Sequence, residues 1–287
     1  MNRWVLGSRP RTLPAAVVPV VVGTAAAVGD ASIIWWRAAA ALVVSLALQI
    51  GTNFSNDYSD GVRGTDDNRV GPTRLVASGL ASARATKRAA MLSFAVAAVV
   101  GLALALTVAW WLVFVGAASV AAGWLYTGGP RPYGYAGLGE VFVFVFFGLV
   151  ATVGSTFVQT EAISAVAVIA AAGVGCLAVA ILVVNNLRDI PTDSTTAKRT
   201  LAVRIGDART RLLYALLLGG AGLCVLGCAV WRPWALLGLL AAVAAVRPLA
   251  TVRSGATAHA LISVLGGTGK LQTMYGVLLA VGLAVSG

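Results

Sequence analysis

One segment of the sequence places acidic and amide side chains at helical spacing. Asp57 and Asp60 are three residues apart, so on a helix they project from one face, with Asn53 and Asn56 on or beside that face one turn earlier. Four of the ten acidic residues of the chain fall within residues 57–67. The pattern predicts a cluster of oxygen atoms at the end of an apolar segment.

A second segment repeats this combination. Asp189 and Asp193 are spaced i,i+4, and Asn185 and Asn186 precede them by one turn. Pro191 lies between the two aspartates, lacks an N–H group and biases the preceding residue away from the α conformation. The two carboxylates are therefore expected to converge either along one helix face or through a turn.

Two carboxylate pairs that face each other suggest a divalent cation, because the cation removes the cost of their repulsion and desolvation. Mg²⁺ prefers oxygen ligands and completes its coordination with substrate phosphates. Basic residues that could bind phosphate oxygens flank both segments: Arg63, Arg188, Lys198 and Arg199. We predict a site for Mg²⁺ and a diphosphate. For Asp67 and Asp207, a solvated loop charge remains the favoured interpretation.

The elements that must position these residues are membrane helices. The chain is 59% hydrophobic and 11% charged, whereas soluble domains carry about 25% charged residues. The alternating pattern of a membrane barrel is missing. Apolar stretches long enough to span a bilayer predict an all-α polytopic bundle that forms one transmembrane domain over residues 1–287. The nine predicted spans lie near 13–29, 38–55, 89–107, 109–127, 138–158, 163–186, 212–230, 234–252 and 268–286.

The charges indicate how the bundle is oriented. With a cytoplasmic N-terminus, 18 of the 21 Lys and Arg residues fall on the cytoplasmic side, all but Arg37, Arg232 and Lys270. Both aspartate segments fall on that same side, and only Asp30 and Glu161 are acids of the opposite face. The net charge of +11 therefore reflects topology and contact with anionic lipids rather than nucleic-acid binding.

Longer motifs around these residues resemble a known family. "NDYSDGVRGTD" at 56–66 and "DIPTD" at 189–193 are similar to the two signatures of the UbiA superfamily of intramembrane prenyltransferases. In the wider superfamily a third acid often stands four residues after the second, where this chain has Gly64 and then Asp66. The form with Asp66 resembles the branch that prenylates 1,4-dihydroxy-2-naphthoate in menaquinone synthesis. Similar stretches occur along essentially the whole chain, at 9–25, 71–79, 126–148 and 185–206.

The resemblance implies a function and a set of roles. A polyprenyl diphosphate and 1,4-dihydroxy-2-naphthoate would react in a central cavity open to lipid, giving demethylmenaquinone, CO₂ and pyrophosphate. The catalytic residues and Mg²⁺ ligands would be Asp57, Asp60, Asp189 and Asp193, with Asp66 as a further ligand. The diphosphate would be bound by Asn53, Asn56, Arg63, Arg188 and Lys198. The aromatic substrate would contact Arg9, Arg11, Asn185, Tyr126 and Tyr133. The enzyme would lie in the bacterial cell membrane with its active-site loops in the cytoplasm.

Other interpretations remain open from the sequence. A related enzyme could prenylate 4-hydroxybenzoate, homogentisate or haem at the same metal site, and a transporter could bind a cation between duplicated halves. Against a transporter, the acids lie on one side of the membrane rather than at its midplane. Arg9 and Arg11 could be topological anchors, the loop after residue 126 could be a lid or a plain connection, and the aromatic run at 141–147 could line the cavity or pack against lipid. Prenyl chain length, oligomeric state and the roles of His259, Lys270 and Glu140 are not predicted.

Overall fold

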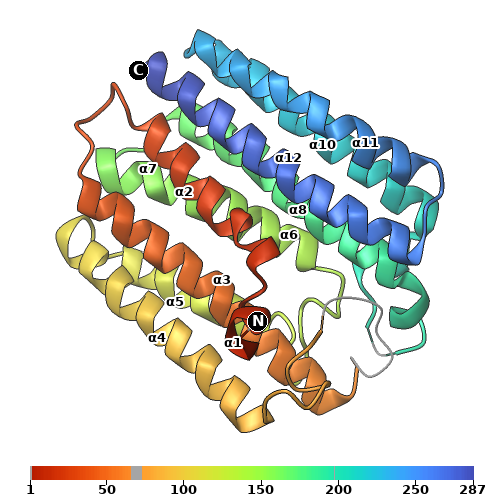
Figure 1. Cartoon of the computed structure of the whole chain (residues 1–287). Coiled ribbons are helices and arrows are strands. Elements are labelled where there is room, and N and C mark those ends of the chain that lie inside the picture. The colour runs from red at the N-terminus through yellow and green to blue at the C-terminus, as the bar shows by residue number, and fades with distance from the viewer. Residues whose placement is uncertain (1, 66–72, 197) are drawn as a thin grey trace.

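A computed structural model of the chain describes residues 2–65, 73–196 and 198–287 as a bundle of helices that run roughly side by side (Figure 1). Within these residues the β pairing consists of one isolated bridge between Val28 and Ala31. The predicted all-α fold is therefore confirmed.

The elements differ in length and regularity. Five are long: α3 (Trp35–Arg63), α4 (Ala83–Thr107), α8 (Ala165–Asp193), α10 (Asp207–Ala229) and α12 (Ala258–Val285). Five are shorter: α1 (Arg3–Ser8), η1 (Pro10–Thr12), α2 (Pro14–Ala26), α5 (Leu112–Leu125) and α9 (Leu201–Ile205). Two further stretches are composite: α6 (Gly139–Val143) continues through η2 (Phe144–Val150) into α7 (Ala151–Thr160), and η3 (Pro233–Ala241) continues into α11 (Ala242–Arg253).

Helices occur at all nine predicted spans. In the described part of the chain, seven helical stretches are long and apolar enough to cross a membrane, and the shorter apolar helices α2 and α5 coincide with the other two predicted spans. The helix ends differ from the prediction, because polar residues extend the helices beyond their apolar stretches. α3 runs to Arg63 rather than to 55, and α12 is one continuous helix from Ala258 in which Lys270 is exposed.

Local sequence explains where the functional helices begin and end. The Ser82 and Ser164 side chains cap α4 and α8, each accepting a hydrogen bond from a backbone N–H of the first turn at 3.2 Å. Gly64 ends α3 with a φ of 69°, a left-handed conformation that glycine adopts without steric cost. Pro191 lies in the last turn of α8 and does not end the helix, so Asp189 and Asp193 share one helix rather than a turn.

The centre of the bundle is α8, which contacts α2, α7, α10 and α12. Its close packing against η2 depends on two glycines, because a Cβ atom on Gly148 would lie 2.6 Å from the Cα atom of Gly175. The largest buried cluster joins α2, α8, α10 and α12 through Val22, Val174 and Leu279. The most buried of the seven long helical stretches therefore carries the second aspartate segment.

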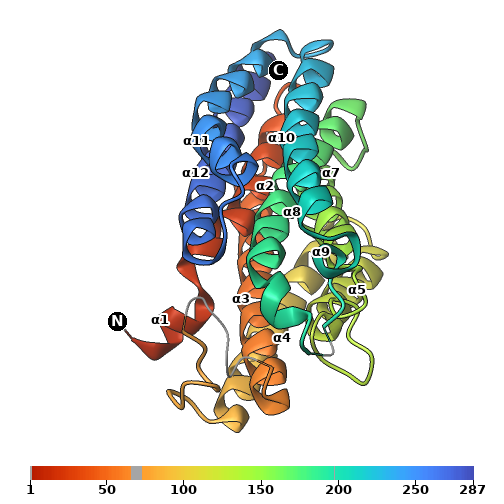
Figure 2. The same cartoon turned by 90° about the vertical axis from the view of Figure 1, so that its right-hand side faces the viewer.

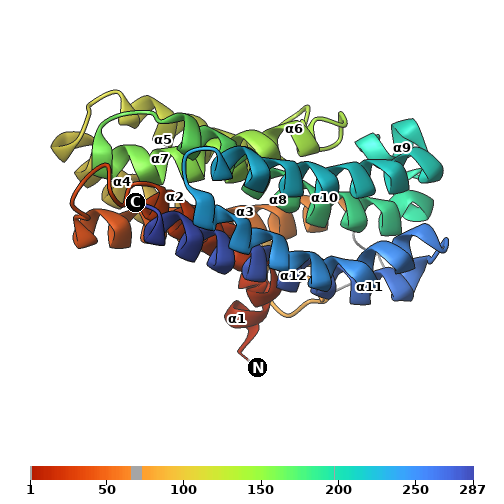
Figure 3. The same ribbon diagram turned by 90° about the horizontal axis from the view of Figure 1, so that it is seen from above.

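The two ends of the bundle have different charge patterns. At one end the charges predicted for the non-cytoplasmic face pair with each other: Arg37 lies 3.3 Å from Glu161, and Arg232 lies 2.9 Å from Asp30. The C-terminus lies at this end in Figure 2, and the N-terminus, with α1 projecting from the bundle, lies toward the other end (Figures 2 and 3). Both aspartate segments are at the C-terminal ends of their helices, α3 and α8.

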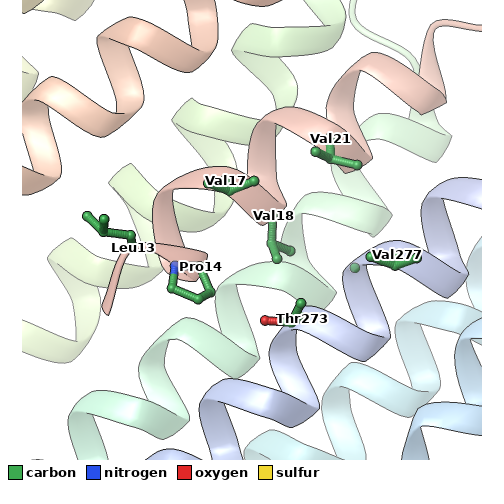
Figure 4. Close-up of a pocket in the computed structure, with 8 residues that line it drawn as sticks. Leu13, Pro14, Val17, Val18, Val21, Thr273 and Val277 are labelled. Atoms are coloured by element: carbon green, nitrogen blue, oxygen red, sulfur yellow. The ribbon is translucent and has the colours of Figure 1, made fainter. Parts of the chain in front are cut away.

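A small apolar pocket of about 270 Å³ lies between α2 and α12. Figure 4 shows Val17, Val18 and Val21 of α2 near Thr273 and Val277 of α12. The residues that line this pocket carry no charged side chain, so it offers no group for acid–base or metal chemistry.

Candidate active site

A cavity of about 810 Å³ opens between the helices, and its wall is polar at one end and apolar elsewhere. The polar end is built at the C-terminal ends of α3 and α8 and from the loops beside them. Its wall includes Arg9, Arg11, Asn53, Asn56, Asp60, Arg74, Asn185, Arg188, Asp189, Asp193 and Lys198. The apolar part includes Leu104, Leu112, Phe146, Phe147, Val150 and Val158.

One stripe of α3 faces this cavity. Gln49, Asn53, Asn56 and Asp60 all line it, and a rotation of about 100° per residue places these four side chains within about 60° of one another around the helix. The Asn53 amide donates to the Ser8 carbonyl at 2.9 Å, and the Asn56 oxygen accepts a hydrogen bond from Thr127 at 2.8 Å. Asn53 and Asn56, predicted to bind diphosphate, and Asp60, predicted to bind Mg²⁺, therefore lie on one face of α3 at the cavity wall.

The buried carboxylate of Asp60 lies between a phenol and an ammonium group. The Tyr135 hydroxyl donates to Oδ1 at 2.8 Å, and Lys198 Nζ donates to Oδ2 at 3.2 Å. Lys198 Nζ also lies 5.1 Å from the centre of the Tyr135 ring. Burial, and then the negative charge of Asp60, raise the pKa of the Tyr135 hydroxyl, so the hydroxyl stays protonated at neutral pH and acts as a donor.

The end of α8 supplies a second charged group. Arg188 forms a two-point ion pair with Asp189, with N–O distances of 2.7 and 2.8 Å, and its Nη2 also donates to Asn185 at 2.9 Å. In the described structure the buried Nη1 of Arg188 has no hydrogen-bond partner. Asp193, one turn later, lines the same cavity. A buried guanidinium N–H without an acceptor suits a phosphate oxygen.

Asp57 differs from its predicted position. It lies about 60–100° around α3 from Asp60 and Asn56, is fully buried, and is not part of the cavity wall formed by the described residues. Its Oδ1 accepts hydrogen bonds from Arg9 and from Arg74, the latter at 2.8 Å. This pairing with two guanidinium groups does not favour a role as a metal ligand.

Arg63 also differs from its predicted position. Its guanidinium group donates to the carbonyl oxygens of Thr127 and Gly129 and lies 5.6 Å from the centre of the Tyr135 ring. The described cavity wall does not include Arg63. Because these carbonyls belong to the loop at 126–138, Arg63 anchors that loop to α3.

The loop at 126–138 covers part of the cavity. Tyr126, Tyr133 and Tyr135 all line it. The Tyr133 ring stacks on Phe142 with centroids 3.9 Å apart, and burial raises the pKa of its hydroxyl. The loop is also held from the other side, where the Arg199 N–H donates to the Tyr135 carbonyl at 2.9 Å. Tyr126 and Tyr133, predicted to contact the aromatic substrate, therefore both lie at the cavity wall.

The remaining predicted residues lie in different places. Arg9, Arg11 and Asn185, which were predicted to contact an aromatic substrate, line the cavity. Asp66 and Asp67 lie outside the described residues. The aromatic run at 141–147 has a mixed environment, since Phe142, Phe146 and Phe147 line the cavity whereas Phe144 packs against a buried cluster.

Sequence reasoning missed two polar residues of this site. Tyr135 and Arg74 contact Asp60 and Asp57 directly, although 75 and 17 residues separate them from these partners. Both lie in irregular segments, where no periodicity predicts a direction for the side chain. The available signal was their position inside the motif stretches at 126–148 and 71–79.

The donor set of this cavity fits Mg²⁺ together with a phosphate ligand. Within residues 2–65, 73–196 and 198–287, no three His, Cys, Asp or Glu side chains lie close enough to hold a metal ion by themselves. The wall nevertheless offers carboxylate oxygens of Asp60, Asp189 and Asp193. Mg²⁺ is typically bound through one or two carboxylates and substrate phosphates rather than an all-protein cage, so the number and type of these carboxylates fit Mg²⁺ with a phosphate ligand.

Known proteins resemble this chain in both sequence and fold. Residues 16–261 match the model of the UbiA prenyltransferase family. A 1,4-dihydroxy-2-naphthoate octaprenyltransferase of Mycobacterium tuberculosis is 52% identical over 282 residues, covering 98% of this chain and 97% of the relative.

Solved structures share the helical arrangement at low sequence identity. A UbiA homologue from Aeropyrum pernix K1, solved in its apo form, has a TM-score of 0.72 at 14% identity and covers 94% of this chain and 96% of its own. A UbiA homologue from Archaeoglobus fulgidus, solved bound to GPP and Mg²⁺, has a TM-score of 0.68 at 14% identity and covers 97% and 99%. The chain is therefore an integral membrane protein that belongs to the UbiA prenyltransferase family.

Proposed function

We propose that this protein transfers a polyprenyl group from polyprenyl diphosphate to 1,4-dihydroxy-2-naphthoate, releasing CO₂ and pyrophosphate and forming demethylmenaquinone. The observation that carries the proposal is a single cavity in which a charged end with three aspartates continues into a long apolar interior. This shape matches a substrate with a diphosphate head and an isoprenoid tail. The mycobacterial relative, at 52% identity, supports the choice of the naphthoate as acceptor.

The charged end holds the diphosphate head in this proposal. Asp60, Asp189 and Asp193 would hold Mg²⁺, with Asn56 as a further oxygen donor, and the bound metal would neutralise charge on the leaving pyrophosphate. Lys198 and the Nη1 of Arg188, which has no hydrogen-bond partner among the described residues, would donate to the remaining phosphate oxygens. Asp66 stays a candidate ligand on the basis of the motif alone.

In the proposed reaction, a prenyl cation and a pyrophosphate anion form where the polar end of the cavity meets its apolar part. The allylic C–O bond breaks, its electron pair leaves with pyrophosphate, and the prenyl carbocation forms next to the aromatic side chains of Tyr133 and Phe142. These side chains exclude water from the cation. The ring carbon that bears the carboxylate attacks the cation, and loss of CO₂ from that carbon restores the aromatic ring in the quinol form of the product.

The acceptor carboxylate needs a cation at the cavity wall. Arg9 is our first candidate and Arg11 the second, since both line the cavity close to the polar end of α3. Asn185, Tyr126 and Tyr133 line the same space and would contact the acceptor ring. We further propose that this end of the cavity faces the cytoplasm of a bacterial cell, as the charge distribution predicts.

A reconstituted assay tests the proposal. The purified protein in lipid nanodiscs would be given labelled polyprenyl diphosphate, Mg²⁺ and either 1,4-dihydroxy-2-naphthoate or 4-hydroxybenzoate. We expect a prenylated naphthoquinol together with equal amounts of pyrophosphate and CO₂. If pyrophosphate is released with 4-hydroxybenzoate but not with the naphthoate, the proposed acceptor is wrong. If pyrophosphate is released with neither acceptor, the protein does not catalyse prenyl transfer.

A further inference from the structure

We propose that Asp57 is a positioning residue that holds two arginines at the cavity wall, one of which binds the carboxylate of the aromatic acceptor. This inference rests on the proposed function and adds to it a role for Asp57 and Arg74. It also gives Asp57 a different role from Asp60, although the sequence predicts that both bind the metal ion.

The Asp57 carboxylate joins three parts of the chain away from the cavity. It is fully buried on α3, where Oδ1 accepts hydrogen bonds from Arg9 and Arg74 and Oδ2 accepts one from the Leu75 backbone N–H at 3.1 Å. Arg9 and Arg74 both line the cavity, whereas Asp57 is not part of the wall that the described residues form. Among the described residues, these two arginines connect Asp57 to the cavity wall.

The backbone at Arg9 has an unfavourable conformation. Arg9 has φ 53° and ψ 71°, the left-handed region, between the end of α1 and Pro10 at the start of η1. A non-glycine residue keeps such a conformation only when its surroundings hold it there. Its Nη2 is bound both by Asp57 and by the Asn53 carbonyl, at 3.3 Å, so α3 holds the side chain in place.

Arg9 has further donors that no described residue uses. Within the described residues its Nε and Nη1 atoms donate no hydrogen bond, and its side chain is 20% exposed on a residue that lines the cavity. A guanidinium group that is held by a carboxylate through one nitrogen can still bind a second carboxylate through the others. The acceptor carboxylate has the charge and the planar shape for that position.

The experiment compares two acceptors in Asp57→Asn protein. 1,4-Dihydroxynaphthalene has the same ring as the naphthoate but lacks the carboxylate, so it cannot use Arg9. For the naphthoate we expect KM, and Kd measured by direct titration without prenyl diphosphate, to rise about tenfold or more, the effect of losing one well-placed charged hydrogen bond. For the carboxylate-free acceptor, for the prenyl diphosphate and for the Mg²⁺ dependence we expect changes below about twofold, since none of them uses this contact.

Asp60→Asn is the matched control, because it replaces a buried carboxylate of the same helix that does line the cavity. It should reduce turnover of both acceptors and raise the Mg²⁺ requirement. If Asp57→Asn lowers turnover equally with both acceptors, or raises the Mg²⁺ requirement, Asp57 acts as a metal ligand and the proposal is overturned.

A second variant covers the case in which Asp57→Asn does not fold. Arg9→Gln leaves the buried carboxylate paired with Arg74 and must show the same selective rise in naphthoate KM and Kd. If both acceptors are affected equally by Arg9→Gln, the proposal is overturned. Product formation by the unaltered enzyme is a separate result, which tests the proposed function rather than the role of Asp57.

Discussion

At the scale of single residues, Asp60 and Asp189 are the carboxylates on which turnover should depend most. Both are buried at the polar end of the cavity and are paired with cations. Asp60→Asn or Asp189→Asn should lower kcat about 100-fold or more, because neutralisation of the leaving group is usually the largest catalytic term. Initial rates with saturating substrates measure this. Asp207→Asn, which alters an exposed ion pair with Arg211, is the control and should keep a kcat close to that of the unaltered enzyme. An equal loss of kcat in this control would argue against specific roles for Asp60 and Asp189.

Tyr135 should act through its hydrogen bond to Asp60. Tyr135→Phe keeps the ring beside Lys198 but removes the hydroxyl that donates to Asp60 at 2.8 Å. Loss of a hydrogen bond to a charged group lowers kcat/KM by about tenfold, measured with prenyl diphosphate as the varied substrate. Tyr58→Phe is the matched control, since Tyr58 stacks on Trp124 and does not line the described cavity. Unchanged kinetics in Tyr135→Phe would contradict a role in orienting Asp60.

The sequence predicted some of these residues because helical spacing is regular. Asn53, Asn56 and Asp60 lie on one stripe of α3, as their spacing indicates. The same spacing also allowed Asp57 to share that face, but in the structure Asp60 lines the cavity whereas Asp57 pairs with Arg9 and Arg74. These pairs depend on how α1 and the segment at 73–82 fold back on α3. Such long-range packing has no periodic signal in a sequence.

At the scale of elements, the sequence predicted the helices better than their ends. Uncharged stretches mark the part of each helix that lies in lipid, but α3 and α8 extend beyond that part to the aspartates at their ends. The π-helical turn of η2 was not predicted, because its residues are ordinary helix-forming and aromatic types. A local π turn rotates the residues that follow it, and in this chain Phe146 and Phe147 of that turn face the cavity.

The contact between α2 and α7 should tolerate no added side chain at Gly23. A Cβ atom there would lie 2.2 Å from the Thr152 carbonyl oxygen and 2.8 Å from the Ser155 Cβ. Gly23→Ala should therefore destabilise the fold by about 1–3 kcal/mol, seen as a lower midpoint of thermal unfolding in detergent. In Gly219→Ala the new methyl group meets no atom within 4 Å on exposed α10, so this control should be neutral or slightly stabilising. Equal midpoints for the two variants would show that the α2–α7 contact is not tight.

At the scale of the whole molecule, the distribution of charge predicts orientation. The aspartate segments and most cations lie at one end, and the other end has the ion pairs Arg37–Glu161 and Arg232–Asp30. In a variant whose native cysteines are replaced by alanine, Arg131→Cys should react with an impermeant maleimide only after cells are opened. Ala162→Cys, exposed in the loop at the opposite end, should react in intact cells. The reverse pattern would invert the proposed topology.

The apolar part of the cavity should limit the prenyl donors that the enzyme accepts. Gly154 of α7 and Gly116 of α5 line it, and a Cβ atom on either glycine would meet no protein atom within 4 Å. Gly154 belongs to the helix end near Glu161, far along the bundle from the aspartates. A short prenyl chain bound by its diphosphate would stop before this position, whereas a long chain would pass it.

Gly154→Phe should therefore discriminate between donors by length. With octaprenyl diphosphate we expect kcat/KM to fall about tenfold or more, the usual cost of forcing a ligand out of an apolar pocket. With geranyl diphosphate it should stay within about twofold, because the diphosphate end of the cavity is unchanged. Gly219→Phe, which places the same ring on the exposed face of α10, controls for bulk alone and should leave both donors unaffected. Equal losses with the two donors in Gly154→Phe would mean that the prenyl tail leaves the cavity before α7, through the side of the bundle into lipid.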